Sequence, residues 1–164
     1  ALILHMKAGH IAKVNTGELP MDNQAQELIP VTAALVDDEH RLDFLPTYFG
    51  PRLMMRGEAL VHGWMRRLAE SYNGGFWNYY TLTNGGFYMA PVLGRLRLEV
   101  DGNGYSGEMS ADAAGIVATL FALGQLAAET QGTDECDALI DRYHWLREYA
   151  GTHAEAAQIY RAID

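Results

Sequence analysis

The chain has 164 residues and a formal net charge of −9, with 49% apolar and 20% charged residues. This length is typical of one domain, which can bury a core without disulfides or metals. An acidic protein has no general attraction for DNA phosphates, no apolar run reaches the roughly 18 residues of a membrane span, and the single cysteine, Cys136, leaves no internal disulfide. We therefore expect a single compact, cytoplasmic, monomeric domain that binds neither DNA stably nor a membrane.

The first twenty residues differ from the rest of the chain. Gly9, Gly17 and Pro20 disfavour regular structure there. We expect residues 1–20 to form a flexible N-terminal leader and residues 21–164 to form the folded domain.

A strand and two helices are expected first. Ile29–Val36 is typical of a strand, which Pro30 restricts to a sheet edge or to the strand's beginning. An acidic run then begins a short helix over 38–45, because acids suit a helix N-terminus, and Pro46 ends it. A longer helix is expected over 51–72. Its apolar stripe includes Leu53, Leu60, Trp64, Leu68 and Tyr72.

A β-hairpin is predicted over 76–90. Asn84-Gly85 lies at its centre, and this dipeptide favours a two-residue type I′ turn. The cross-strand pairs that follow from such a turn are Leu82 with Phe87 and Tyr80 with Met89.

A second hairpin and three helices complete the expected order. Residues 95–100 alternate charged and apolar side chains before a turn at 101–104, which predicts a sheet with one buried face. Ser110 is positioned to cap a long apolar helix, and a further helix is expected from Thr133 or Asp134 to Gly151. The last short helix carries Ile159, Tyr160 and Ile163. The fold class is therefore α+β, an antiparallel sheet of hairpins packed with four to five helices in one compact domain.

Motifs that carry chemistry are weak. The six histidines show no zinc-ligand spacing. Asp101-x-Asn103 resembles the beginning of a calcium loop, but Tyr105 occupies the third ligand position, so a hairpin turn is the better interpretation. Cys136 lies among acids, which disfavour a thiolate, and we expect it in the core. We predict no catalytic residue, no metal and no cofactor.

Three segments together resemble the ArdB/KlcA antirestriction family. They are RLDFLPTYFGPRLMMRGEALVHGWMRRL (41–68), YNGGFWNYYTLTNGGFYMAP (72–91) and MSADAAGIVATLFAL (109–123), and the resemblance covers about residues 28–150. It implies a small mixed α/β protein, encoded on plasmids and other mobile elements, that protects incoming DNA from type I restriction-modification enzymes. The implied mode of action is inhibition without catalysis or a cofactor, and the partner is the restriction enzyme or an associated host protein.

Charge is segregated along the chain. Residues 52–97 contain six arginines and two glutamates, whereas residues 99–164 contain twelve acids and three arginines. Charge patches steer association and select partners. The candidate partner-binding residues are Arg56, Arg66, Arg67, Trp77 (if exposed), Asp137, Asp141 and Glu148.

Two alternatives remain open from sequence. In the first, the acids imitate duplex phosphates as a DNA mimic, although six arginines in the middle of the chain weaken this hypothesis. In the second, the protein is a nucleic-acid-binding module or an unrecognised enzyme. The aromatic hairpin beside Arg95 and Arg97 could stack single-stranded bases, and acids distant in sequence could converge in the fold.

Overall fold

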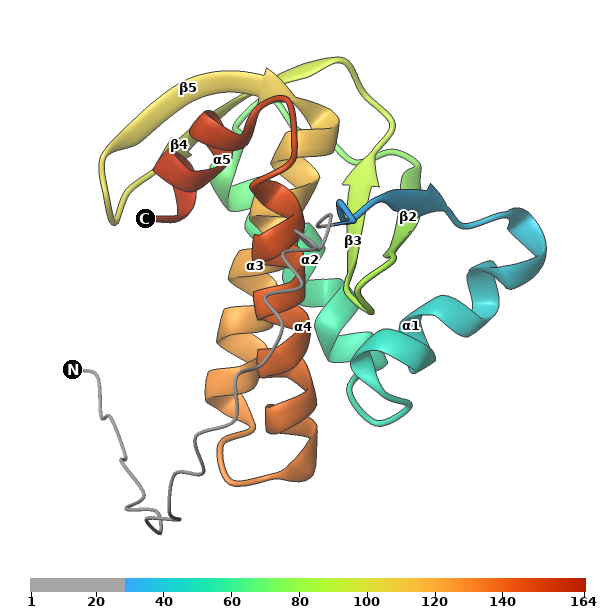
Figure 1. The fold of residues 1–164 in the computed structure, drawn as a ribbon. Coiled ribbons are helices and arrows are strands. Elements are labelled where there is room, and N and C mark those ends of the chain that lie inside the picture. Colours follow the sequence, from blue (N-terminus) through green and yellow to red (C-terminus); the bar gives the residue numbers. More distant parts are fainter. Residues whose placement is uncertain (1–28) are drawn as a thin grey trace, which may run out of the picture.

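The computed structural model describes residues 29–164, so the leader expected over residues 1–20 lies outside the described residues. The elements in chain order are β1 (Ala33–Leu35), the 3₁₀ turn η1 (Asp38–His40), α1 (Arg41–Phe49), α2 (Met54–Leu68), β2 (Trp77–Leu82), β3 (Phe87–Pro91), β4 (Arg95–Val100), β5 (Tyr105–Ser110), α3 (Ala111–Glu129), α4 (Asp134–Ala150) and α5 (Ala156–Ile163). Helices and antiparallel hairpins follow one another within one domain, which confirms the α+β class (Figure 1).

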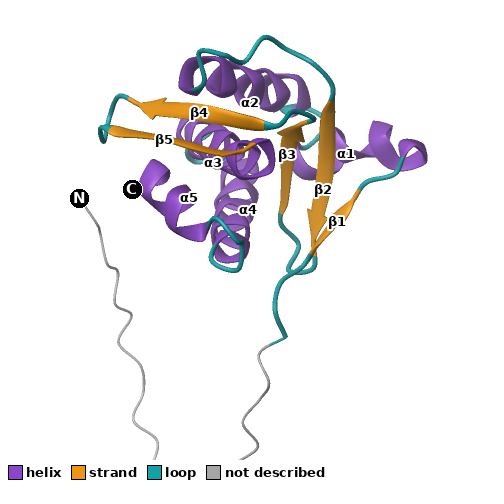
Figure 2. Ribbon diagram, turned by 90° about the horizontal axis from the view of Figure 1, so that it is seen from above, coloured by secondary structure: helices purple, strands orange, loops and turns teal. Residues whose placement is uncertain are grey.

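The strands form two separate antiparallel sheets where the sequence suggested one. One sheet has the order β1-β2-β3, and the other contains only β4 and β5. Figure 2 shows the β4–β5 ribbon along one side of α3, with the three-stranded sheet and α1 at the other end of the molecule. The β4 strand alternates exposed and buried residues as predicted, with Leu96, Leu98 and Val100 inward.

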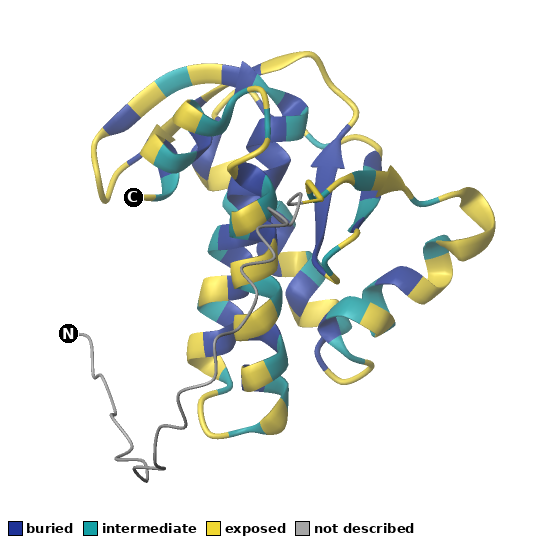
Figure 3. Cartoon of the chain, in the orientation of Figure 1, coloured by how far each residue is buried: buried dark blue, intermediate teal, exposed yellow. Residues whose placement is uncertain are grey.

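Helix α3 is the centre of the domain. It packs against α2, α4, α5 and strands of both sheets, and most of its length is buried (Figure 3). Its many alanines favour helix and let neighbouring elements approach closely. By length and composition α3 could cross a membrane, but 72% of its most apolar window is buried inside the domain. The apolar side chains of α3 are therefore mostly buried against the other elements of the domain.

Helix α1 continues past Pro46, contrary to the prediction that this proline ends it. It extends to Phe49 and stops at Gly50, whose φ of 83° lies in the left-handed region. A proline inside a helix removes one backbone hydrogen bond. Aromatic packing offsets that loss, because Tyr48 and Phe49 both contact the Phe87 ring, at centroid distances of 4.9 and 5.0 Å.

Helix α2 is shorter at both ends than the predicted range 51–72. Residues 51–53 form turns, and the chain becomes extended at Ala69. The apolar stripe continued to Tyr72, but Tyr72 packs from outside the helix and its hydroxyl accepts a 2.7 Å hydrogen bond from Trp77 Nε1. The apolar periodicity of the sequence does not distinguish a buried tyrosine on the helix from one that follows the end of the helix.

The first hairpin forms where it was predicted, but its register is shifted by one residue. Tyr80 pairs with Tyr88, and Tyr79 pairs with Met89. The Gly85 N–H donates to the Leu82 carbonyl at 3.0 Å, and Gly85 has φ 97° while Asn84 does not have positive φ. The loop therefore contains three residues, a type I turn followed by a left-handed glycine, and not a two-residue type I′ turn.

The predicted cap at Ser110 is confirmed, because its hydroxyl accepts from the Ala113 N–H at the beginning of α3. The next helix begins at Asp134, one of the two predicted positions, and the Thr133 hydroxyl caps it by accepting from the Cys136 N–H. Cys136 is buried, as expected, and its thiol donates to the Ala127 carbonyl at 3.2 Å.

Candidate interaction surface

The predicted contact residues do not form one surface. Arg56, Arg66 and Arg67 lie on α2, whereas the acids Asp137, Asp141 and Glu148 lie on α4. Helix α3 packs between these two helices (Figure 2). A single partner surface built from both sets is therefore not available.

Part of the segregated charge is neutralised within the molecule. Arg56 makes a bidentate ion pair with Glu129, with N–O distances of 2.5 and 3.1 Å. These bonds lower the pKa of the Glu129 carboxyl. Arg52 pairs with Glu135 at 2.9 Å. Arginines of the basic middle thus meet acids of the C-terminal third.

Trp77 does not meet the condition of exposure on which its role depended. Its side chain is 4% exposed, and it packs beside His62 with a ring-centroid distance of 4.7 Å. Alternation along β2 turns Trp77 toward the interior together with Tyr79. Trp77 is a core residue and is removed from the set of surface contacts.

A different tryptophan, Trp64, is partly exposed and lies within a group of stacked side chains on the surface. Its ring stacks on Phe121 of α3 at 4.8 Å, and its Nε1 donates to Gln125 Oε1 at 2.9 Å. The Arg67 guanidinium lies over the same ring, 5.0 Å from its centroid. Tryptophan and arginine that are held in place but partly accessible are typical of the residues that dominate protein interfaces.

Hollows surround this stacked group, and we call them together the Trp64 groove. Those bordering Trp64 have volumes of about 330, 250 and 130 Å³. A further hollow of about 400 Å³ adjoins them and shares Arg67 and Leu68 with the smallest. The residues that line the groove include Trp64, Arg67, Phe121, Gln125, Tyr143 and Ile163.

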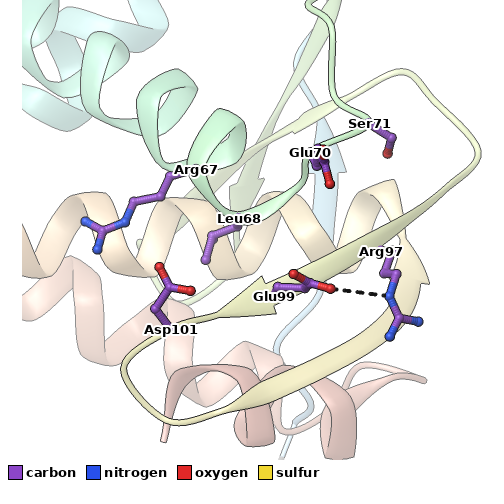
Figure 4. A pocket seen from close by; sticks show the side chains of 7 residues that line it. All are labelled: Arg67, Leu68, Glu70, Ser71, Arg97, Glu99 and Asp101. Atoms are coloured by element: carbon purple, nitrogen blue, oxygen red, sulfur yellow. Dashed lines mark ion pairs between the residues drawn. The ribbon is translucent and has the colours of Figure 1, made fainter.

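The hollow of about 400 Å³ forms one end of the groove and is lined mainly by charged side chains. Figure 4 shows Arg67 and Leu68 of α2 facing Glu99 and Asp101 across it. Arg97 is engaged with Glu99 at 3.7 Å. Arg67 forms no ion pair within residues 29–164, so its charge is available to a partner.

The sequence reasoning missed this groove. It assigned Trp64 to the buried stripe of α2, whereas Phe121 and Gln125 come from α3, about sixty residues away. The available signal was the spacing of Trp64 and Arg67, which places a cation one turn from an aromatic ring on the same helix face.

A partly buried polar cluster was also missed. The Tyr88 hydroxyl donates to Asp112 at 2.9 Å, and His153 Nε2 contacts the other oxygen of that carboxylate at 2.8 Å. The Glu155 N–H donates to His153 Nδ1, which leaves the proton on Nε2 to donate to Asp112. Burial raises the pKa of Tyr88 far above its ordinary value, so the phenol stays protonated. The hydrogen bonds of the cluster join β3, α3 and the α4–α5 connection, so we interpret the cluster as stabilising the fold.

Over residues 29–164, no group of three or more histidine, cysteine or acidic side chains is arranged to hold a metal ion. The Asp101–Asn103 turn is a hairpin turn in which Asn103 Oδ1 accepts from the Tyr105 N–H at 2.9 Å.

Comparison with known proteins assigns the family. A family model described as antirestriction protein matches residues 70–164, from the end of α2 to the C-terminus. The chain belongs to the antirestriction protein family. Antirestriction protein KlcA from Escherichia coli is 74% identical over 136 residues, covering 82% of this chain and 96% of that protein. A second KlcA from Escherichia coli is 68% identical over 138 residues, with coverages of 82% and 94%.

A solved structure of the same family has the same fold. It superposes with a TM-score of 0.77 at 68% sequence identity, covering 92% of this chain and all of that chain. It comes from a study of the KlcA and ArdB proteins, which describes a novel fold and antirestriction activity against type I DNA restriction systems in vivo but not in vitro. The resemblance read from the sequence is thereby confirmed.

Proposed function

We propose that this antirestriction protein acts in the bacterial cytoplasm, where it inhibits type I restriction-modification systems and so protects incoming mobile DNA. The supporting observation is 68% identity, over 92% of the chain, to a structure from a study that reports this activity for KlcA and ArdB.

The proposed mode of action is protein binding without catalysis. Residues 29–164 contain two close aspartate–histidine pairs, Asp112 with His153, which also binds Tyr88, and Asp37 with His40, which is exposed. Within these residues, no serine, threonine or cysteine side chain is hydrogen-bonded to either histidine, so neither pair is positioned to activate a nucleophile. The KlcA and ArdB activity occurs in vivo but not in vitro. That contrast favours a partner that cells contain and purified reactions lack, either a host protein or a restriction complex in a cellular state.

We assign the partner surface to the Trp64 groove. The stacked rings of Trp64 and Phe121 supply rigid aromatic surface, and Arg67, which forms no ion pair with any residue of the described range, supplies charge at the rim. Aromatic and arginine side chains held in place by neighbours lose little conformational entropy on binding. Arg56 contributes at the edge, with its charge already shared with Glu129.

DNA mimicry is the weaker alternative. Of the acids in the C-terminal third, Glu129, Glu135 and Glu155 are paired with arginines. A mimic would need an unbroken acidic row, because duplex DNA carries about one charge per 1.7 Å of its axis.

A plating assay tests the function. Unmodified phage is plated on hosts that carry a type I system, a type II system or none, with and without this protein. We expect plating on the type I host to rise by at least about tenfold, and the other hosts to show no change. No rise on the type I host would contradict the proposal.

Variants test the surface. Arg67→Glu changes one exposed charge and is expected to reduce protection by at least about tenfold, since reversed rim charges slow association. Trp64→Ala should abolish protection while circular dichroism shows a folded chain. Leu42→Ala, at a residue 90% exposed on α1, is the matched control and should protect fully. If both groove variants protect fully, the partner does not bind at the Trp64 groove.

A further inference from the structure

The outer edge of β1 is unpaired among the described residues. Antiparallel pairing with β2 is fixed by the Val36 N–H donating to the Tyr79 carbonyl at 2.8 Å and the Thr83 N–H donating to the Thr32 carbonyl at 3.0 Å. Backbone groups alternate in direction along a strand. The N–H and C=O groups of Ala33 and Leu35 therefore point away from β2, and no other residue of the described range pairs with them.

The edge strand is short, but none of its three residues is charged or a proline. Proteins guard edge strands with lysine, proline, bulges or covering elements. Here the strand sequence is Ala33-Ala34-Leu35, and the Leu35 side chain is 59% exposed. Figure 2 shows β1 as the outermost strand of its sheet, next to the loop that leads toward α1.

A hollow of about 330 Å³ lies next to this edge, between β1 and α1. It shares no lining residue with the Trp64 groove. Its floor is largely apolar or aromatic, and its rim is acidic. The lining residues are Leu35, Val36, Asp37, His40, Asp43, Phe44, Thr47, Tyr48 and Thr81. A strand added to β1 would direct alternate side chains toward this hollow.

The charge around the edge is strongly negative. Asp37, Asp38, Glu39 and Asp43 are all exposed, and within residues 29–164 only His40 pairs with any of them, through Asp37 at 2.5 Å. That hydrogen bond raises the pKa of His40.

The nearest arginine does not neutralise these acids. The Arg41 Nη2 donates to the Trp77 carbonyl at 2.9 Å, and its guanidinium lies over the rings of Phe76 and Tyr79, at 4.5 and 4.2 Å from their centroids. Arg41 is thus held at the sheet, and no arginine within residues 29–164 pairs with the acidic rim, which favours a basic partner.

We propose that the outer edge of β1 binds an extended segment of a partner protein as an added strand, and that this segment alternates basic with apolar residues. The outward backbone groups of Ala33 and Leu35 supply affinity, the hollow receives an apolar side chain, and Asp37 and Asp43 select lysine or arginine. This proposal stands independently of the antirestriction function, because binding is measured on the purified chain.

The test is a titration of the ¹⁵N-labelled full chain with a hexapeptide of alternating lysine and valine, blocked at both ends. We expect amide shifts concentrated at Ala33, Leu35 and the residues of the hollow, and an affinity that falls as salt is added. Two comparison peptides are used, one with glutamate in place of lysine and one methylated at alternate backbone nitrogens. Both should bind at least about tenfold more weakly.

Variants make the result specific to the edge. Leu35→Pro removes an outward N–H while leaving the hydrogen bonds to β2 in place, and it should reduce peptide binding by at least about tenfold. The double variant Asp37→Asn and Asp43→Asn should weaken binding of the lysine peptide and reduce its salt dependence. If Leu35→Pro disturbs the fold, the methylated peptide provides the same test on the unaltered chain.

The outcomes are decisive in both directions. Equal binding of the methylated and unmethylated peptides, or shifts confined to the Trp64 groove, would overturn the proposal. Plating protection is scored separately for the Leu35→Pro chain. Loss of peptide binding with protection intact supports the edge site as distinct from the antirestriction surface, whereas failed protection by the unaltered chain concerns only the proposed function.

Discussion

At the scale of single residues, two glycines of α3 illustrate opposite roles. A Cβ at Gly115 would lie 2.3 Å from the Met89 carbonyl oxygen and 2.6 Å from the Ala90 Cα, both backbone atoms of β3. A Cβ at Gly124 would meet nothing within 4 Å. Gly115 therefore permits close approach of helix and sheet, while Gly124 only borders the groove at Trp64.

These positions predict opposite effects of the same substitution. Gly115→Ala should destabilise the fold by about 1–3 kcal/mol, because the backbone of β3 must shift to admit the methyl group. Gly124→Ala should stabilise it by up to about 1 kcal/mol, because alanine favours helix. Urea unfolding followed by circular dichroism measures both. A stable Gly115→Ala chain would mean that α3 and β3 are not packed as described.

At the scale of elements, one carboxylate joins the beginning of α3 to that of α5. Glu155 accepts from the Ser110 N–H at 3.0 Å and from the Ser110 hydroxyl, and Arg95 of β4 lies 3.6 Å away. Burial opposes ionisation of Glu155, but the hydrogen bonds from Ser110, together with the charge of Arg95, outweigh it, so the pKa of Glu155 is lowered. The same Ser110 hydroxyl caps α3.

The lowered pKa fixes the sign of a pH effect. A carboxyl whose pKa is lower in the folded state stabilises the fold at neutral pH, and this contribution is lost as pH falls below the ordinary glutamate value of about 4.3 and through the folded pKa. We expect Glu155→Gln to be less stable than the unaltered chain at pH 7, and we expect this difference in stability to shrink as the pH falls toward about 3.

Urea midpoints across that pH range provide the measurement. Glu108→Gln is the matched control, since Glu108 is 63% exposed and 3.9 Å from the same arginine. A stability difference for Glu155→Gln that stays constant with pH would show that the ionised carboxylate is not the source of the effect.

At the scale of the whole molecule, charge that is segregated in sequence is mixed in space. Arg52, Arg56 and Arg95 pair with Glu135, Glu129 and Glu155. These contacts join the turn before α2, α2 itself and β4 to α4, α3 and the α4–α5 connection, respectively. Few arginines of the basic middle are left for an external anion, while the net charge remains −9.

We therefore predict no binding to duplex DNA. A mobility-shift assay with a 30-base-pair duplex, at a low ionic strength of about 50 mM where phosphate contacts are strongest, should show free DNA at all protein concentrations. A shift that disappears as salt is raised would contradict this prediction and revive the nucleic-acid-binding alternative.

Much of the element order could be read from the sequence because its signals are local. The caps at Ser110 and Thr133 act on N–H groups three residues away, and the alternation in β4 reflects one buried face. The hairpin at Asn84-Gly85 was placed correctly, but its register was wrong, because two- and three-residue loops both accommodate these residues and only packing on both faces of the sheet distinguishes them.

The sequence by itself determined the family, the α+β order, most element boundaries to within a few residues, and the burial of Cys136. The tertiary structure alone decided that Trp77 is buried and Trp64 accessible, that α1 continues through Pro46, that the arginines of α2 meet distant acids, and that β1 presents a free edge. The physical reason is the separation in sequence between the residues that each kind of interaction involves. Caps, turns and periodicity depend on neighbours within a few residues, whereas exposure, charge pairing and strand edges depend on residues tens of positions apart.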